Sequence, residues 1–360
     1  MAITKDQVLQ QLRKVNEPEL HRDLVTLNLV KNVAVCEGLI SVQVELAPSA
    51  GGFKDQLRQQ IDAAVRELGG VEQVTIEFVN PPQPTAQQKA ASSNPLPNVK
   101  HIIAVGAGKG GVGKSTVSVN LAVGLALTGA RVGLLDGDIY GPSAPTMLGL
   151  SGLELKGTPR QTMIPFAVHG IRAISIGALV EDEKPLIWRG PMAHGAFRDL
   201  ATRTEWGDLD YLIIDLPPGT GDVPLTMSQL LPLTGAVVVC TPQKVAQDDA
   251  RRAVRMFQQL DINVMGIVEN MSYFIGDDGK EYDIFGRGGA QQMAQQMGVP
   301  FLGTVPINMA LRANSDSGTP LKNFEPGTKL NDELNALVRA LQAQVSVSAL
   351  ESKAPTINIH

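Results

Sequence analysis

The sequence contains only two cysteines, Cys36 and Cys240, among its 360 residues. Two thiols exclude a framework of several disulfides, and they cannot form a four-thiolate metal site within one chain. The sequence also lacks any apolar run of the roughly 18 residues that a membrane span needs. Its first residues, MAITKDQVLQQLRK, have no apolar core of a signal peptide. We therefore expect a cytoplasmic protein.

The charge balance is also unremarkable, with 31 Lys+Arg against 36 Asp+Glu and a net charge of -5. Such a chain has no excess of positive charge that would attract nucleic acid. Binding to a membrane surface would need a basic face, and the sequence shows none. We expect neither partner. Hydrophobic residues make up 43% of the chain, which is enough for a buried core and excludes wholesale disorder.

One low-complexity stretch divides the chain. Residues 80–98 read NPPQPTAQQKAASSNPLPN, which is too polar and too rich in proline to bury a core, so residues 81–98 are predicted to be a flexible linker. Before it, residues 1–80 alternate helical and β-rich stretches and predict a small α+β domain. After it, residues 99–346 predict the main domain, followed by a tail over 347–360.

The main domain alternates short apolar strands with helices. HIIAVG, RVGLLD, YLIID and AVVVC are short and consist mostly of apolar, often β-branched residues, as in strands that are covered on both faces. This pattern predicts an α/β fold with a doubly wound, mostly parallel sheet.

The clearest motif follows the first of these strands. GKGGVGKS matches G-x-x-x-x-G-K-[ST], with a strand before it and a helix after it, as a phosphate-binding P-loop requires. Glycines allow the backbone N–H groups to turn toward phosphate oxygens, and the helix adds its positive dipole end. A glycine-rich turn without a ligand is the alternative, which this context disfavours. The predicted nucleotide-binding residues are Gly108, Lys109, Gly110, Gly111, Val112, Gly113, Lys114, Ser115 and Thr116.

Three acidic residues complete the predicted site. Asp215 ends the strand YLIID, where a carboxylate orients the Mg²⁺ shell together with the hydroxyl of Ser115. Asp136 ends the strand RVGLLD and would reach the metal through water; its alternative role is a strand-end cap. Asp138 follows in DGDIYGPS, where a carboxylate near the γ-phosphate can position the attacking water.

Lys114 and Lys109 are the two lysines of the loop. Lys114 is predicted to bridge the β- and γ-phosphates, and with Asp138 and Lys109 it makes up the predicted catalytic set. A second lysine early in the loop is not required by the general motif. Charge supplied in trans can accelerate phosphoryl transfer by about 10³–10⁵, so Lys109 suggests a dimer that closes across the nucleotide.

Four motifs resemble one family: AVGAGKGGVGKST, DGDIYGPS, LIIDLPPGTGD and ENMSYF followed by IFGRGGA. The paired lysines resemble the deviant P-loop of the nitrogenase-iron-protein, MinD and ParA superfamily. Together the motifs look like the Mrp/ApbC family of iron–sulfur cluster carrier proteins over residues 98–345. The segment VNEPELHRDLVTLNLVKNV resembles the small metal–sulfur-cluster-assembly domain often fused to bacterial members.

This resemblance implies an ATP-hydrolysing homodimer that needs ATP and Mg²⁺, with apo iron–sulfur proteins and cluster-assembly factors as partners. It implies that Lys109 reaches the nucleotide of the other subunit, that Asp138 activates water and that Asp215 belongs to the Mg²⁺ shell. Asn270, after the strand GIVEN, would recognise adenine; an ordinary turn cap is the alternative.

The sequence departs from the family at the cluster ligands. Family members carry a C-x-x-C pair just after MSYF, where this chain has Gly276, Asp277 and Asp278. Cys36 lies in the small domain, and Cys240 ends an apolar strand and is interpreted as a buried small hydrophobe. The resemblance therefore implies an iron–sulfur cluster carrier whose ligands the sequence does not identify.

Other functions in the superfamily remain as alternatives. A ParA- or MinD-like positioning ATPase would bind DNA or membrane, but the net charge and the last residues, which carry a single lysine after position 345, disfavour it. A reductase like the nitrogenase iron protein would need two cysteines beside the nucleotide switches, and this chain has only Cys240 in its main domain.

Overall fold

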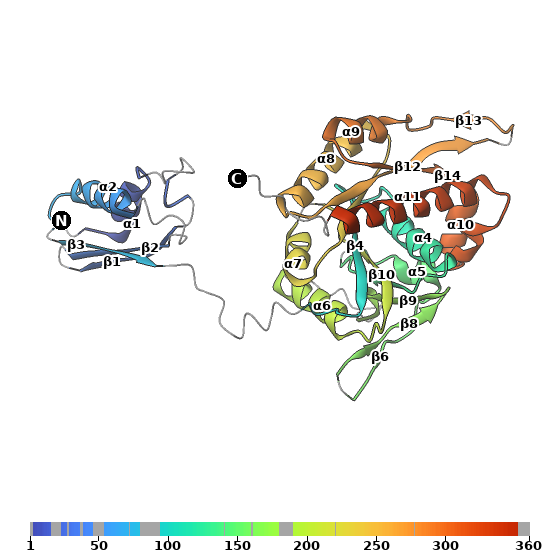
Figure 1. The fold of residues 1–360 in the computed structure, drawn as a ribbon, viewed down its shortest axis with the longest axis horizontal. Coiled ribbons are helices and arrows are strands. Elements are labelled where there is room, and N and C mark those ends of the chain that lie inside the picture. The colour runs from blue at the N-terminus through green and yellow to red at the C-terminus, as the bar shows by residue number, and fades with distance from the viewer. Residues whose placement is uncertain are drawn as a thin grey trace. The chain divides into compact units, whose positions relative to one another are not determined.

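The computed structural model describes most of the chain, and everything below concerns the described residues, namely 3–15, 23–26, 29–36, 39–45, 54–71, 73–79, 94–139, 141–159, 161–179, 190–219, 221–276 and 278–351. The chain divides into two compact units, Met1–Ser93 and Asn94–His360, each with its own core (Figure 1).

The smaller unit packs helices on one three-stranded sheet. Its α1 begins with a capping box, since Thr4 accepts a hydrogen bond from the backbone of Gln7, whose side chain accepts one from the backbone of Thr4. β1 and β2 run antiparallel, and β3 joins β2 in parallel. Apolar residues of both helices and of β2 form the core, which confirms the predicted α+β class. The elements are α1 (Lys5–Leu12), β1 (Val30–Cys36), β2 (Leu39–Glu45), α2 (Lys54–Arg66) and β3 (Gln73–Val79).

The larger unit is built on a nine-stranded sheet whose strand order is β13-β12-β11-β4-β10-β5-β9-β8, with β14 also paired to β12. The pairings from β12 to β9 and that of β14 are parallel, whereas β13 and β8 add antiparallel pairs at the edges. The strands are β4 (Val99–Gly106), β5 (Val132–Asp136), β8 (Phe166–Val168), β9 (Ile171–Ser175), β10 (Leu209–Asp215), β11 (Gly235–Cys240), β12 (Val264–Ile275), β13 (Glu281–Tyr282) and β14 (Phe301–Ile307).

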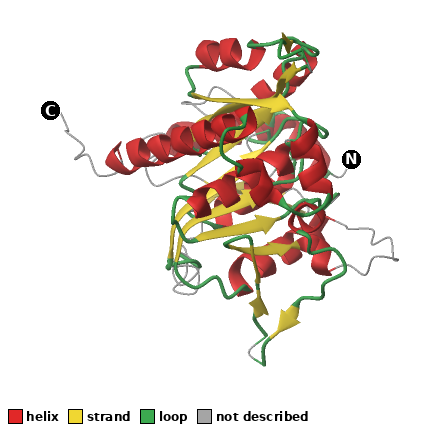
Figure 2. Ribbon diagram, turned by 90° about the vertical axis from the view of Figure 1, so that its right-hand side faces the viewer, coloured by secondary structure: helices red, strands yellow, loops and turns green. Residues whose placement is uncertain are grey.

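Helices cover both faces of this sheet (Figure 2), which confirms the doubly wound fold. Alternate residues of β4 separate the two cores, because Ile102 packs on one side and Ile103 on the other. One face carries α6 (Gly190–Arg203), α7 (Asp222–Leu230), α8 (Lys244–Gln259) and α9 (Gly289–Met297). The other carries α4 (Lys114–Leu127), α5 (Ala144–Leu148), α10 (Met309–Asp316), the 3₁₀ helix η3 (Pro320–Phe324) and α11 (Lys329–Glu351).

The structure differs from the sequence prediction at three element boundaries. Leu96 is buried in the core of the larger unit, so residues 94–98 pack with that unit although they end the predicted linker. α11 runs to Glu351, into the segment expected to be a tail. β12 continues to Ile275, past the predicted strand, and turns back through β13. Residues 80–93 and 352–360 lie outside the described part of the chain.

The sheet register brings the functional motifs to one edge. Asp215 at the end of β10 is the register partner of Asp136 at the end of β5 and of Val105 in β4. The loop after β4 therefore starts beside both carboxylates.

Candidate functional site

The P-loop connects β4 to α4 and depends on glycines at two turns. Gly111 and Gly113 have φ values of +78° and +81°, in the left-handed region that other residues rarely adopt. Gly113 is the N-cap of α4, so the first turn of that helix faces the loop. The backbone thus has the form of a cradle of N–H groups in front of a helix N-terminus.

Two neighbours hold this loop so closely that glycine is required. A Cβ added at Gly108 would lie 2.1 Å from the backbone oxygen of Asp249 in α8. A Cβ added at Gly113 would lie 2.0 Å from the side-chain nitrogen of Asn270. That nitrogen donates a hydrogen bond of 2.8 Å to the carbonyl of Val112. The loop is therefore held between α8 and the middle of β12.

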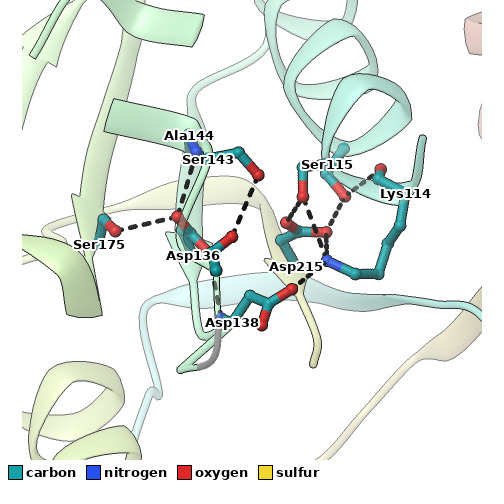
Figure 3. A network of polar contacts seen from close by, with 10 residues as sticks. Lys114, Ser115, Asp136, Asp138, Ser143, Ala144, Ser175 and Asp215 are labelled. Carbon is teal, nitrogen blue, oxygen red and sulfur yellow. Dashed lines mark hydrogen bonds and ion pairs between the residues drawn. The ribbon is translucent and has the colours of Figure 1, made fainter. Parts of the chain in front are cut away.

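Lys114 lies at the centre of the site and is 6% exposed (Figure 3). Its Nζ is 2.8 Å from Asp215 Oδ1 and 3.4 Å from Asp138 Oδ2. It also lies 3.2 Å from the hydroxyl of Ser115. These contacts make Lys114 the counter-charge of two buried carboxylates.

Asp215 also accepts hydrogen bonds from two serine hydroxyls of α4. Ser115 Oγ donates to Asp215 Oδ2 at 2.5 Å, and Ser118 Oγ donates to Asp215 Oδ1 at 2.7 Å. Ser118 lies one helical turn after Lys114 and bonds its carbonyl as well. The carboxylate and the hydroxyl of Ser115 therefore form a compact pair of oxygen donors beside the lysine.

Asp136 is fully buried, and hydrogen-bond donors surround its carboxylate (Figure 3). The backbone N–H of Asp138 donates to its Oδ1 at 3.1 Å, while the N–H of Ala144 and the hydroxyl of Ser175 donate to Oδ2 at 3.2 and 2.9 Å. Burial, and then the nearby Asp215 carboxylate, raise the pKa of Asp136 to about 7. Its bond to the backbone of Asp138 fixes the start of the loop that carries that residue.

The site contains more carboxylates than basic side chains. Asp136, Asp138 and Asp215 are all less than 8% exposed, and Lys114 is the cation that pairs with two of them. A divalent cation beside Ser115 and Asp215 would offset this charge, so the donor set fits Mg²⁺. No group of three His, Cys, Asp or Glu is close enough to hold a metal alone in the described part of the chain.

Other predicted residues stand at the border of this network. Lys109 is half-buried, and its ammonium forms neither a hydrogen bond nor an ion pair with any described residue. Thr116 is half-buried on the first turn of α4. Asn270 is 4% exposed and contacts the loop backbone through its amide nitrogen. The structure thus brings Asn270 to the P-loop, and its role toward adenine stays a prediction.

Sequence reasoning missed several polar residues of the site. Ser118 and Ser175 each bond one of the central carboxylates, and Glu269 is a fully buried carboxylate next to Asn270. Ser118 had a usable signal, because it lies at helical spacing from Ser115 and Lys114. Ser175 ends β9 and Glu269 lies within β12, and only the arrangement of the sheet and of α9 shows what they contact.

The turn between β12 and β13 occupies the positions where the resemblance implies a cysteine pair. The N–H of Gly276 bonds the carbonyl of Lys280, and Tyr282 donates to Asp278 at 2.8 Å. A Cβ at Gly276 would lie 2.8 Å from the Tyr282 ring. Asp277 lies outside the described residues. The described part of this turn is therefore closed by its own polar bonds.

Cys240 is buried at the end of β11 and forms no disulfide. Burial, and then the carboxylate of Glu269, raise the pKa of its thiol to about 12. Because a thiolate is the species that binds metal, this thiol is unsuited to ligate a cluster. The side chain of Cys36 lies outside the described part of the structure.

Known proteins match both units. A family described as "NUBPL iron-transfer P-loop NTPase" matches residues 98–342, and one described as "Iron-sulfur cluster assembly protein" matches residues 5–78. An iron–sulfur cluster carrier protein of Synechocystis sp. is 46% identical, covering 97% of this chain and 99% of its own length. The chain belongs to the iron–sulfur cluster carrier P-loop NTPase family. This confirms the resemblance read from the four motifs.

Solved structures agree with this family. A nucleotide-binding protein of Archaeoglobus fulgidus in complex with ADP is 39% identical, with a TM-score of 0.57 over 64% of this chain and 91% of that one. MinD of Pyrococcus horikoshii, complexed with Mg-ADP, has a TM-score of 0.53 at 19% identity over 69% of this chain and 98% of that one, and shows the shared fold. In the part of this carrier-family chain that the structure describes, no helix has the length and apolarity to cross a membrane.

Proposed function

We propose that this protein is an ATP-hydrolysing iron–sulfur cluster carrier that works as a homodimer. The observation that carries the proposal is the position of Lys114 at the P-loop, where its Nζ contacts the carboxylates of Asp215 and Asp138. Such a lysine, ahead of a helix N-terminus and beside a hydroxyl and a strand-end aspartate, is the constellation that phosphoryl transfer from a nucleotide needs.

In this proposal the loop from Gly108 to Thr116 binds the phosphates of ATP. Its N–H groups would contact the phosphate oxygens, and Lys114 would exchange its contact with Asp138 for one with the β- and γ-phosphates. Asn270 supports the loop from behind through the carbonyl of Val112 and, as proposed from the sequence, would also recognise the adenine.

Ser115 and Asp215 would hold Mg²⁺, and Asp136 would act on it through water. When bound, the ion neutralises charge that develops on the phosphate oxygens. Ser118 keeps the carboxylate of Asp215 directed toward Ser115, because it bonds the other carboxylate oxygen. The donors to Asp136 keep the strand end rigid.

Asp138 would orient the attacking water. Its backbone is fixed by Asp136, while its side chain reaches Lys114 at 3.4 Å. Once the lysine turns to the phosphates, the carboxylate of Asp138 would no longer be paired with it and would accept a hydrogen bond from water.

Lys109 would act in the other subunit. It has no hydrogen bond or ion pair among the described residues, so its ammonium can extend toward a second nucleotide. A cation delivered in this way accounts for the proposed homodimer, with each subunit completing the site of its partner.

The cargo would be an iron–sulfur cluster delivered to apo iron–sulfur proteins, with cluster-assembly factors as donors. This part rests on the family and on the match of residues 5–78 to iron–sulfur cluster assembly proteins. Burial and a raised pKa disfavour Cys240 as a ligand. The ligands would therefore come from Cys36 or from the donor and acceptor proteins.

Anaerobic reconstitution tests this proposal. The full-length chain is incubated with iron and sulfide, desalted and mixed with an apo ferredoxin, with and without Mg-ATP. We expect ATP hydrolysis together with cluster transfer that exceeds the rate of free iron and sulfide. If the protein hydrolyses ATP but does not change the rate of cluster transfer, it is an ATPase without a carrier function, and the proposal is refuted.

A further inference from the structure

β12 makes an unusual turn where it passes the P-loop. Met271 has a φ of +55°, in the left-handed region that a bulky residue rarely adopts because its side chain is strained there. The pairing of β12 with β14 shifts register between Asn270 and Phe274. The strained residue directly follows Asn270, which contacts the P-loop.

A buried carboxylate closes this turn. Glu269 is 0% exposed, and the hydroxyl of Ser272 donates to its Oε1 at 2.6 Å, across the turn at Met271. The backbone N–H groups of Gly288 and Ala290 donate to the same carboxylate at 2.9 and 2.8 Å. These donors and the N-terminus of α9 compensate the buried charge, since no lysine or arginine among the described residues pairs with it.

The turn presents Asn270 to the loop. The amide nitrogen of Asn270 donates to Val112 at 2.8 Å and fills the space that a side chain at Gly113 would take. The methyl group of Met271 also faces this glycine, 3.9 Å from an added Cβ. The shape of the P-loop at residues 112–113 therefore depends on the direction in which β12 leaves Asn270.

We propose that Glu269 is a positioning residue for the nucleotide loop. Through Ser272 it locks the left-handed turn at Met271, and the turn aims Asn270 at the carbonyl of Val112, so that the loop is preorganised before a ligand arrives. The proposal deepens the proposed function and rests on it only for the effect on nucleotide affinity, because the effect on the loop itself exists without nucleotide.

A simpler role for Glu269 is to cap α9 through Gly288 and Ala290. The two roles make different predictions for Ser272→Ala, which removes the bond across the turn and leaves both backbone bonds to the carboxylate. They also differ for Met271→Gly, because glycine adopts a positive φ without strain and needs no lock. Ser346→Ala is the matched control, as Ser346 bonds a carbonyl on the exposed surface of α11.

Hydrogen–deuterium exchange on the nucleotide-free, full-length chain tests the proposal first. We expect Ser272→Ala and Glu269→Gln to speed exchange of residues 108–116, and Ser346→Ala to leave it unchanged. In the double variant Ser272→Ala/Met271→Gly, exchange should return to the level of Met271→Gly alone. This measurement does not depend on any function of the protein.

Calorimetric titration with Mg-ADP then measures the consequence. Because a hydrogen bond to a charged group is lost, we expect Ser272→Ala to weaken binding about tenfold. The double variant should bind within about threefold of Met271→Gly alone. The affinity of the unaltered chain tests the proposed function separately, since the inference concerns only the ratios between variants.

Two results would overturn the proposal. One is loop exchange in Ser272→Ala that equals that of the unaltered chain while Glu269→Gln speeds it, which would leave Glu269 as a cap of α9. The other is a double variant that remains as perturbed as Ser272→Ala, since then the turn at Met271 does not transmit the effect.

Discussion

Asp136 and Asp215 are register partners at the ends of neighbouring parallel strands, and both are buried beside one lysine. Two carboxylates this close make the site strongly acidic unless a cation is present. Lys114 and the serine hydroxyls stabilise the negative charge of these carboxylates. The pKa of Asp136 is also raised, which favours its neutral form. The site is therefore held together by the groups that the proposed reaction requires.

Lys114→Ala should abolish ATP binding and destabilise the fold. The substitution removes the phosphate contact and also leaves Asp138 and Asp215 without their shared counter-charge. Breaking a buried ion pair by removing one partner costs about 3–5 kcal/mol. Calorimetry with Mg-ATP and thermal unfolding at pH 7.5 measure the two effects, and retained affinity would contradict the assignment.

Lys109→Ala should separate binding from turnover. Since the side chain has no partner among the described residues, the melting temperature should stay within about 2 °C and ATP affinity within about threefold. Turnover should fall by about 10³ if the lysine acts in trans. Steady-state ATPase assays check this, and unchanged turnover would refute the catalytic role of Lys109.

Ser118→Ala tests the orientation of Asp215. Losing one hydrogen bond to a buried carboxylate should lower the free energy of unfolding by about 1–2 kcal/mol and raise the Mg²⁺ concentration needed for ATP hydrolysis. Ser346→Ala is the control, because that hydroxyl also bonds a carbonyl one helical turn back but is exposed. Equal effects of the two substitutions would mean that Ser118 has no special role.

The pKa of Asp136 predicts a pH dependence of stability. Its folded value of about 7 lies above that of an unfolded aspartate, so the native chain binds more protons than the unfolded chain between about pH 4 and 7. The contribution of Asp136 to stability is therefore largest below about pH 4 and is lost as the pH rises through 7.

Asp136→Asn should remove this contribution, because its side chain stays neutral. Chemical denaturation of the nucleotide-free chain at pH 5.5 and pH 8 measures the difference between the two proteins. We expect the unaltered chain to lose more stability than the variant over this interval. A smaller loss in the unaltered chain would contradict the raised pKa.

Much of the fold could be predicted from the sequence, because its strands are short apolar runs and its phosphate-binding motif lies between a strand and a helix. HIIAVG, RVGLLD and YLIID became β4, β5 and β10, and their last residues meet at one edge, as parallel strands require. The sequence also indicated Lys114, Ser115 and the three aspartates as one site, and the structure brings them together.

The remainder depends on contacts between segments distant in sequence. Ser175 reaches Asp136 only because β9 pairs with β5, and Glu269 reaches Gly288 only because the hairpin turns back. β12 continues through SYFI because it pairs with β13, which no local pattern indicated. The burial of Leu96 likewise follows from packing against the core rather than from its proline-rich surroundings.

Cluster transfer from the reconstituted full-length protein to an apo ferredoxin tests the proposed carrier function most directly. The transfer is followed by the visible absorption of the ferredoxin under anaerobic conditions. We predict that Mg-ATP changes the transfer rate of the unaltered protein and has no effect on the Lys109→Ala variant, which should bind ATP and fail to hydrolyse it. Normal ATP hydrolysis without any cluster transfer would contradict the proposed carrier function, and so would transfer that is indifferent to ATP in both proteins.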